Sequence, residues 1–251
     1  MNRPPALAIA GATKRFGAVL ALDAVDLSVN HGEVLALLGD NGAGKSTLIK
    51  CISGVYRLDE GTIEMDGQTI DIASPAVARS LGIETVYQDL ALFDNLDPAA
   101  NFYAGREVAG PRWLPRGLRL MRRTDMAGDT AAVLKRLQVG IPDSSTTVGL
   151  MSGGQRQAIA VARAAAFDSR IVILDEPTAA LGVRESRRVL DLILRLRDEG
   201  RAVIVISHAM DHVIEIADRA AVLRRGRKVG EEIPHADNRQ RIVSLIVGGD
   251  G

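Results

Sequence analysis

Residues 39–47 have the types and spacing that bind phosphate groups. They are Gly39, Asp40, Asn41, Gly42, Ala43, Gly44, Lys45, Ser46 and Thr47, and they fit G-x-x-x-x-G-K-[ST] in full. Glycines let backbone N–H groups approach phosphate oxygens, and a helix starting at about Gly44 adds its positive end. We expect Lys45 to reach the β- and γ-phosphates and the Ser46 hydroxyl to bind Mg²⁺. The segment therefore predicts a site for a nucleoside triphosphate with Mg²⁺.

Two acidic residues, Asp175 and Glu176, follow the apolar run 171–174. A strand that carries acids at its carboxyl end places them in the crevice where α/β proteins bind ligands. Asp175 is suited to hold Mg²⁺ through water, and Glu176 to deprotonate the water that attacks the γ-phosphate. An acidic pair after a strand is common by itself. Beside a complete phosphate loop, it predicts a hydrolytic site.

A histidine, His208, follows the apolar run 202–206 with only Ser207 between. A lone histidine at the end of a strand is more often structural than functional. This one follows the next predicted strand after Glu176, which favours a contact with the γ-phosphate.

A second segment with the features of an anion site is Ser152, Gly153, Gly154 and Gln155, which opens a helix predicted over 156–167. Ser152 is a good N-cap, and glycines at a helix N-terminus leave N–H groups accessible to an anion. The simpler interpretation is an ordinary capped helix. Two segments suited to bind phosphate are unexpected in a chain with a single nucleotide site.

Helices and buried strands alternate around these segments. The runs 34–38, 171–174 and 202–206 are continuously apolar, as expected for parallel strands covered on both faces. Apolar residues at helical spacing predict helices over 183–199 and 211–217. This order is typical of an α/β fold.

Two regions depart from that alternation. Strands predicted at 6–15, 25–30 and 62–65 indicate an antiparallel patch beside the main sheet. Between residues 90 and 167 the strand signal disappears, and 124–137 is an amphipathic helix. We therefore predict a single domain over 1–251, with an α/β core at about 1–89 and 168–230. A helical insert occupies about 90–167, and a short tail covers 231–251.

Composition narrows the functional classes. The chain has 251 residues with 31 Lys+Arg and 31 Asp+Glu, a balance that does not suggest binding to nucleic acid. The single cysteine, Cys51, allows no intrachain disulfide and favours a reducing compartment. No apolar run approaches the ~20 residues of a membrane-spanning helix, and no signal peptide is visible. We expect a cytoplasmic location unless another protein holds the chain at a membrane.

Arginines are frequent in two stretches. The first, 106–123, reads either as a solvated loop or as a contact with anionic lipid or a partner subunit, and its Trp113 has no role that we can assign. The second, 224–228, reads as the tip of a hairpin.

Taken together, Phe16, residues 39–47, Gln88, residues 152–155, residues 171–176 and Ser207-His208 resemble the ATP-binding subunits of ABC transporters. The order and spacing match from about residue 6 to residue 230. The resemblance implies a RecA-like P-loop NTPase core with the antiparallel patch and the helical insert, and the ligands ATP and Mg²⁺. It also implies a head-to-tail dimer in which Ser152–Gln155 of one copy faces the phosphate loop of the other. By the same resemblance, Phe16 would stack on adenine, and Gln88 would sense Mg²⁺ or the attacking water and transmit closure to membrane subunits.

Within this family the chain is similar to sugar importers of the ribose, fructose and xylose type. Residues 84–92, 101–107 and 177–182 carry that similarity. It implies a homodimer bound to a separate permease at the cytoplasmic face of the plasma (inner) membrane, served by an external sugar-binding protein and with no nucleic-acid partner. The alternatives are a transporter of another cargo or a soluble ABC ATPase acting on DNA or ribosomes. A monomeric P-loop kinase or GTPase would leave Ser152–Gln155 unexplained.

Two positions differ from the family pattern. Met151 stands where leucine usually precedes Ser-Gly-Gly-Gln, a swap of similar volume. Gly182 stands where the wider family usually has an aspartate that reaches across the dimer. The glycine puts in doubt how tightly two ATP sites would communicate.

Overall fold

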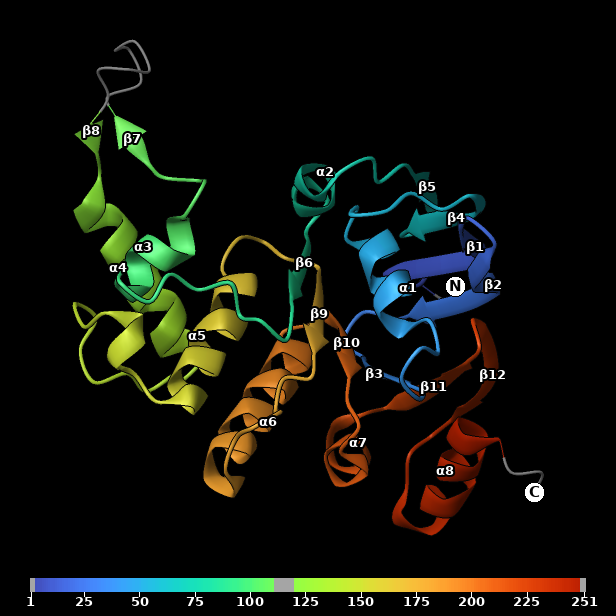
Figure 1. The fold of residues 1–251 in the computed structure, drawn as a ribbon. Helices are drawn as coiled ribbons and strands as arrows, with labels where there is room; N and C mark the ends of the chain where they lie inside the picture. The colour runs from blue at the N-terminus through green and yellow to red at the C-terminus, as the bar shows by residue number, and fades with distance from the viewer. Residues whose placement is uncertain (1–2, 111–119, 249–251) are drawn as a thin grey trace.

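The computed structural model describes residues 3–110 and 120–248. Its centre is a six-stranded sheet in the order β12-β11-β3-β10-β9-β6 (Figure 1). The strands are β3 (Val34–Leu38), β6 (Ile83–Val86), β9 (Ile171–Asp175), β10 (Ala202–Ile206), β11 (Arg219–Arg224) and β12 (Arg227–Glu232). All neighbours pair in parallel except β12, which is antiparallel to β11 at the edge. The predicted parallel α/β core is confirmed, and so is the basic hairpin tip between β11 and β12.

Alternate residues of the central strands are buried in different clusters, which explains why these strands read as continuous apolar runs. On β3, Leu35 and Leu37 belong to one cluster, and Ala36 and Leu38 to another. The first cluster includes helix α1 (Lys45–Ile52) and the antiparallel strands. The opposite face is covered by α6 (Val183–Asp198), α7 (Met210–Ile216) and α8 (Arg239–Val247). Both faces are therefore shielded from water.

The second sheet is antiparallel, in the order β2-β1-β4-β5. It consists of β1 (Leu7–Phe16), β2 (Val19–Val29), β4 (Glu60–Met65) and β5 (Gln68–Ile70), and helix α2 (Pro75–Ser80) follows it. The predicted patch is confirmed, but the prediction missed β5 and started β2 six residues late. The first part of β2 is only partly buried, so its apolar residues give no clear alternation.

Three helices form the separate lobe at the left of Figure 1: α3 (Pro98–Tyr103), α4 (Arg123–Arg136) and α5 (Gly153–Ala164). Helix α4 lies one residue from the predicted bounds. Helix α5 begins three residues earlier and ends three residues earlier than predicted, because the capping box of Ser152 and Gln155 starts the helix at Gly153. The bounds of the insert as a unit, 90–167, stay a prediction.

The sequence prediction missed two features. A short ladder pairs β7 (Ala109–Gly110) with β8 (Leu120–Met121) inside the region expected to lack strands. Two residues per strand are too few for a sequence signal. The tail predicted over 231–251 contains helix α8, whose Ile242 is fully buried against the face of β3 and β11.

The arginine-rich stretch 106–123 is described at its two ends, and residues 111–119, with Trp113, lie outside the described residues. At one end Arg106 pairs with Glu84 and stacks 4.3 Å from the ring centroid of Phe167. That arginine is therefore packed rather than solvated. Among residues 3–110 and 120–248, no helix is both long and apolar enough to span a membrane.

Candidate functional site

The loop between β3 and α1 has a backbone that only glycine permits at two positions. Gly39 has φ 148° and Gly44 has φ 107°. A Cβ at Gly39 would lie 2.3 Å from the carbonyl oxygen of Leu223, and one at Gly44 would lie 2.8 Å from that of Ala21. Gly42, with φ 79°, has open space where its Cβ would be. The loop is thus packed on one side and open on the other, as a phosphate cradle requires.

Lys45, the first residue of α1, folds back over this loop. Its Nζ donates hydrogen bonds to the carbonyl oxygens of Gly39 (2.7 Å) and Asp40 (3.0 Å). Burial lowers the pKa of Lys45, and the nearby carboxylates of Glu176 and Asp175 oppose that shift. The lysine thus stands between the loop and the acidic pair. Ser46, on the first turn of α1, is exposed, and Thr47 beside it is half-buried.

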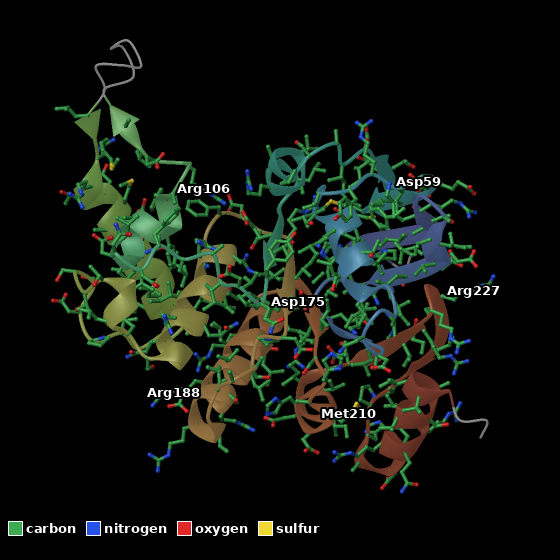
Figure 2. All side chains as sticks on the ribbon, in the orientation of Figure 1. Asp59, Arg106, Asp175, Arg188, Met210 and Arg227 are labelled. Atoms are coloured by element: carbon green, nitrogen blue, oxygen red, sulfur yellow. The ribbon has the colours of Figure 1, made fainter. Side chains whose placement is uncertain are left out.

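The acidic pair lies at the carboxyl end of β9, near the centre of the molecule (Figure 2). Burial raises the pKa of Asp175, partly offset by Lys45 and His208. Burial also raises the pKa of Glu176, and His208 again opposes the shift. Glu176 has φ 51°, and its N–H donates to the carbonyl of Ile206 at the end of β10 (3.0 Å).

His208 faces this pair from the end of β10. Its Nε2 lies 3.3 Å from Oε1 of Glu176. Nevertheless, among the residues that the structure describes, no hydrogen bond reaches Oε1, which is buried. The two side chains therefore approach closely without hydrogen-bond geometry. A buried carboxylate oxygen without a hydrogen bond can accept one from a ligand or water.

The structure also brings Gln88 to this edge of the sheet. Val86 pairs with Leu174, so two residues further along, Gln88 follows β6 as Glu176 follows β9. Gln88 is exposed, whereas its neighbour Tyr87 is anchored by a 2.9 Å hydrogen bond between its hydroxyl and that of Ser53. Phe16 ends β1 with 41% of its surface exposed and lies edge-on to Tyr56, their ring centroids 5.1 Å apart.

Ser152–Gln155 is not brought together with these residues. It lies at the start of α5 in the helical lobe, and Figure 1 shows the central strands between α5 and α1. The Ser152 hydroxyl accepts from the N–H of Gln155 (3.3 Å), whose side chain accepts from the N–H of Ser152 (3.0 Å). A Cβ at Gly154 would lie 2.5 Å from Cγ of Glu185, so only glycine fits there.

Two contacts near the site escaped the sequence prediction. Arg163 of α5 donates to the carbonyls of Leu90 (3.0 Å) and Ala91 (2.8 Å), just after Gln88. Thr178 and His212 share a hydrogen bond of 3.0 Å. Arginine is abundant in this chain and the partners of Arg163 are backbone atoms, so no residue pattern marks the first contact. The second joins residues that are 34 positions apart in the sequence, so no local pattern marks it.

The comparisons with known proteins agree with this architecture. Residues 22–179 match the ABC transporter family. The chain is 50% identical to the fructose import ATP-binding protein FrcA of Rhizobium meliloti over 230 residues, 91% of this chain and 88% of that protein. It is 45% identical to the xylose/arabinose import ATP-binding protein XylG of Sulfolobus acidocaldarius over 93% of this chain and 90% of that protein. It is 44% identical to the ribose import ATP-binding protein RbsA of Yersinia pestis, where it spans 47% of that longer chain.

Solved structures show the same fold. A nucleotide-free ATP-binding cassette from an ABC transporter superposes with a TM-score of 0.82 at 25% identity, covering 97% of both chains. An ABC transporter cassette in its ADP conformation gives 0.80 at 24% identity, over 97% of this chain and 99% of that one. The predicted P-loop NTPase core and the resemblance on which it rested are confirmed. The chain belongs to the ABC transporter family, as one of its ATP-binding, ATP-hydrolysing domains.

Proposed function

We propose that this chain hydrolyses ATP at Glu176 to energise import of a simple sugar through a separate membrane permease. The observation that carries the catalytic part is the carboxylate of Glu176: half-buried, with a raised pKa and an oxygen without a hydrogen bond, beside the phosphate loop. A general base needs a pKa closer to neutrality than that of a solvated carboxylate. The fructose, xylose/arabinose and ribose import proteins support the cargo class.

The donors fit ATP with Mg²⁺. Among residues 3–110 and 120–248 there is no cluster of three His, Cys, Asp or Glu side chains that would cage a metal by itself. This suits Mg²⁺, which takes one or two protein ligands plus phosphate oxygens and water. Ser46, Asp175 and Gln88 would hold the ion, and Mg²⁺ would neutralise charge on the β- and γ-phosphates.

The chain's own residues then perform the steps. Loop N–H groups and the start of α1 bind the phosphates, and Lys45 exchanges its carbonyl contacts at Gly39 and Asp40 for phosphate oxygens. Glu176 orients the attacking water and accepts its proton, while His208 contacts the γ-phosphate. Phe16 stacks on the adenine ring.

Two copies complete the sites. The N-terminus of α5, with Ser152 as its cap, and the phosphate loop lie on different sides of the central strands, so one chain cannot apply both to the same ATP. In a dimer, Ser152–Gln155 of each copy would close over the ATP bound by the other. The positive end of α5 would then stabilise the γ-phosphate.

The permease would dock on the helical lobe. A groove of about 900 Å³ lies between α3 and α4, and its lining includes the exposed side chains of Phe93 (53%) and Met121 (52%). The first residue that lines the groove, Phe93, is five residues after Gln88, so a conformational change at the ATP site would be transmitted to a subunit bound there. We place the chain at the cytoplasmic face of the membrane through this contact, with an external sugar-binding protein delivering cargo.

The first test is Glu176→Gln. We expect ATP affinity close to that of the wild type and a turnover lower by roughly 10²–10⁴-fold, because the amide cannot accept the proton of water. ATP should also convert this variant to a stable dimer, measured by light scattering after size exclusion. Glu60→Gln, an exposed change on β4, is the matched control. Near-wild-type turnover in Glu176→Gln would remove the catalytic assignment.

The cargo is tested in native membranes. Co-purification of the tagged chain with a polytopic permease, together with loss of radiolabelled fructose, ribose or xylose uptake when the gene is deleted, would support sugar import. Recovery of ribosomes or DNA-repair proteins instead would favour a soluble ATPase. Intact uptake of all three sugars would point to another cargo.

A further inference from the structure

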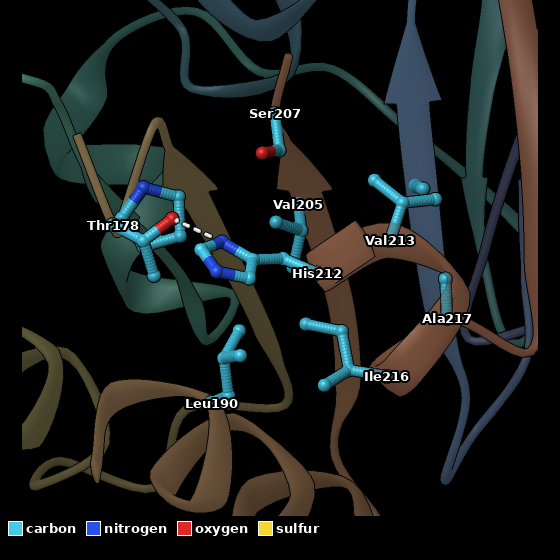
Figure 3. A pocket seen from close by; sticks show the side chains of 10 residues that line it. Thr178, Leu190, Val205, Ser207, His212, Val213, Ile216 and Ala217 are labelled. Carbon is cyan, nitrogen blue, oxygen red and sulfur yellow. Dashed lines mark hydrogen bonds between the residues drawn. The ribbon is translucent and has the colours of Figure 1, made fainter. Parts of the chain in front are cut away.

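A hydrogen bond joins the segment after Glu176 to the helix after His208. Oγ1 of Thr178 and Nδ1 of His212 are 3.0 Å apart (Figure 3). Thr178 is two residues beyond Glu176 and is 8% exposed. His212 is four residues beyond His208, on α7, and is half-buried. The bond therefore links the two backbone segments that carry Glu176 and His208, whose side chains lie 3.3 Å apart.

The surroundings of this pair indicate a support rather than a ligand site. The pair lines a cavity of about 10 Å³ whose other walls are mostly apolar and include Leu190, Val205 and Ile216. That volume is no larger than the space for one water. His212 also borders an open groove with Arg187, Arg188 and Glu215, but the cavity side of the pair is apolar, and there the hydrogen bond is shielded from water and strengthened.

The segment that Thr178 anchors needs such support. Glu176 has φ 51° and Ala180 has φ 59°, and both are non-glycine residues in the left-handed region. Each such residue costs roughly 1 kcal/mol or more, so the surrounding contacts must hold the conformation. At its start the segment is tied to β10 by the bond from Glu176 N–H to the carbonyl of Ile206 (3.0 Å), and its other backbone bonds are short-range, from Ala179 to Glu176 (3.1 Å) and from Leu181 to Thr178 (3.4 Å). The bond to His212 adds a link to a different element.

We propose that His212 and Thr178 form a positioning pair that fixes Glu176 relative to His208 during ATP hydrolysis. Neither residue needs to touch ATP, and both act through the backbone of the catalytic segments. The proposal rests on the proposed role of Glu176. It predicts a loss of turnover without a loss of nucleotide affinity, because the phosphate loop and α1 lie outside the pair's contacts.

The experiment measures kcat and KM for ATP in variants of both partners. His212→Ala and Thr178→Val should each lower kcat by about 10- to 100-fold, the range expected for misplacing a reacting group by up to 1 Å, with KM nearly unchanged. His212→Asn places an amide atom where Nδ1 lies and should recover most of the loss, as should Thr178→Ser. The double variant should be no slower than the worse single variant, because both remove the same bond.

A matched control lies on the same helix. Glu215 pairs with Arg187 of α6, so Glu215→Gln loosens a contact of α7 without reaching the Thr178 segment. Its kcat should equal that of the wild type. If His212→Ala does not fold, as judged by circular dichroism, Thr178→Val tests the same bond from the other side.

The outcomes separate cleanly. A raised KM with unchanged kcat, multiplied losses in the double variant, or no rescue by His212→Asn would each overturn the positioning pair. Failure of the proposed catalytic role would appear elsewhere, as wild-type turnover in Glu176→Gln.

Discussion

At the scale of single residues, the half-buried carboxylate of Glu176 lowers the stability of the folded chain when it is ionised, although its proposed function needs that ionised form. Burial raises the pKa of Glu176 above its ordinary value, which means that the folded chain disfavours the ionised form. The cost is complete above the folded pKa and disappears as pH falls below the unfolded value. Replacing the carboxylate by an amide should therefore stabilise the nucleotide-free chain at neutral pH.

We expect Glu176→Gln to raise Tm by on the order of 2 °C at pH 7.5, and the gain to shrink as pH is lowered through the folded pKa of Glu176. Differential scanning calorimetry from pH 4 to pH 8 measures this. A gain that stays constant over that range would show that it does not arise from the charge.

The turnover of the wild type should fall over the same acid range. Protonated Glu176 cannot accept the proton of the attacking water, so kcat should drop about tenfold for each pH unit below the pKa of this group in the ATP complex. A steady-state pH profile at saturating ATP and Mg²⁺ gives the answer. A flat acid limb would mean that proton transfer to Glu176 does not limit the rate.

At the scale of elements, the start of the helical lobe depends on one buried amide. Asn101 of α3 is completely buried, and its Oδ1 accepts from the N–H of Phe93 (2.7 Å). Its Nδ2 donates to the carbonyls of Phe93 (3.1 Å), Leu96 (3.3 Å) and Asp97 (3.0 Å). One side chain thus shapes the turn that leads from the Gln88 segment into α3.

Asn101→Ala should destabilise the chain by about 1–3 kcal/mol, because the backbone groups of that turn lose their partners in a buried site. Urea unfolding followed by circular dichroism measures the change. The exposed neighbour Asn95 gives the control: Asn95→Ala should stay within about 0.5 kcal/mol of the wild type.

The elements also show what sequence patterns can and cannot reveal. The strand before Gly39 and the strand that ends at Asp175 were predictable because they are continuous apolar runs, and the long helix α6 because its apolar residues follow the helical period. Helix α8 was not predictable, because Ile242 is its only buried residue among the described positions. For the candidate site, local motifs pointed to Lys45, Asp175 and Glu176, which the structure brings together, whereas Gln88 and Phe16 were named only through the family resemblance. The contacts of Arg163 and His212 depend on tertiary packing, which no spacing in the chain encodes.

At the scale of the whole molecule, the separation of Ser152 from the phosphate loop makes the proposed dimer testable by mixing. Lys45→Ala disables the loop. Ser152→Asp keeps an N-cap on α5 but places a negative charge against the partner's γ-phosphate. Each variant alone should be inactive, because every site then contains a defect.

In a mixture of the two, half of the dimers carry one intact site out of two, so we expect about a quarter of wild-type ATPase activity in a phosphate-release assay. Restored activity requires that residues of two copies meet at one ATP. A mixture no more active than its components would contradict shared sites.

The two hydrogen bonds from Arg163 to the carbonyls of Leu90 and Ala91 link the helical lobe directly to the segment after Gln88. Whatever rotates the lobe also displaces that segment, and the two rearrangements share one free-energy change. Binding equilibria linked in this way are reciprocal: if ATP tightens the hold on a permease by some factor, the permease must tighten the hold on ATP by the same factor. Nucleotide affinity measured on the isolated chain would then be lower than the affinity in the assembled transporter. The ratio of the two affinities would measure how strongly ATP binding is coupled to permease binding.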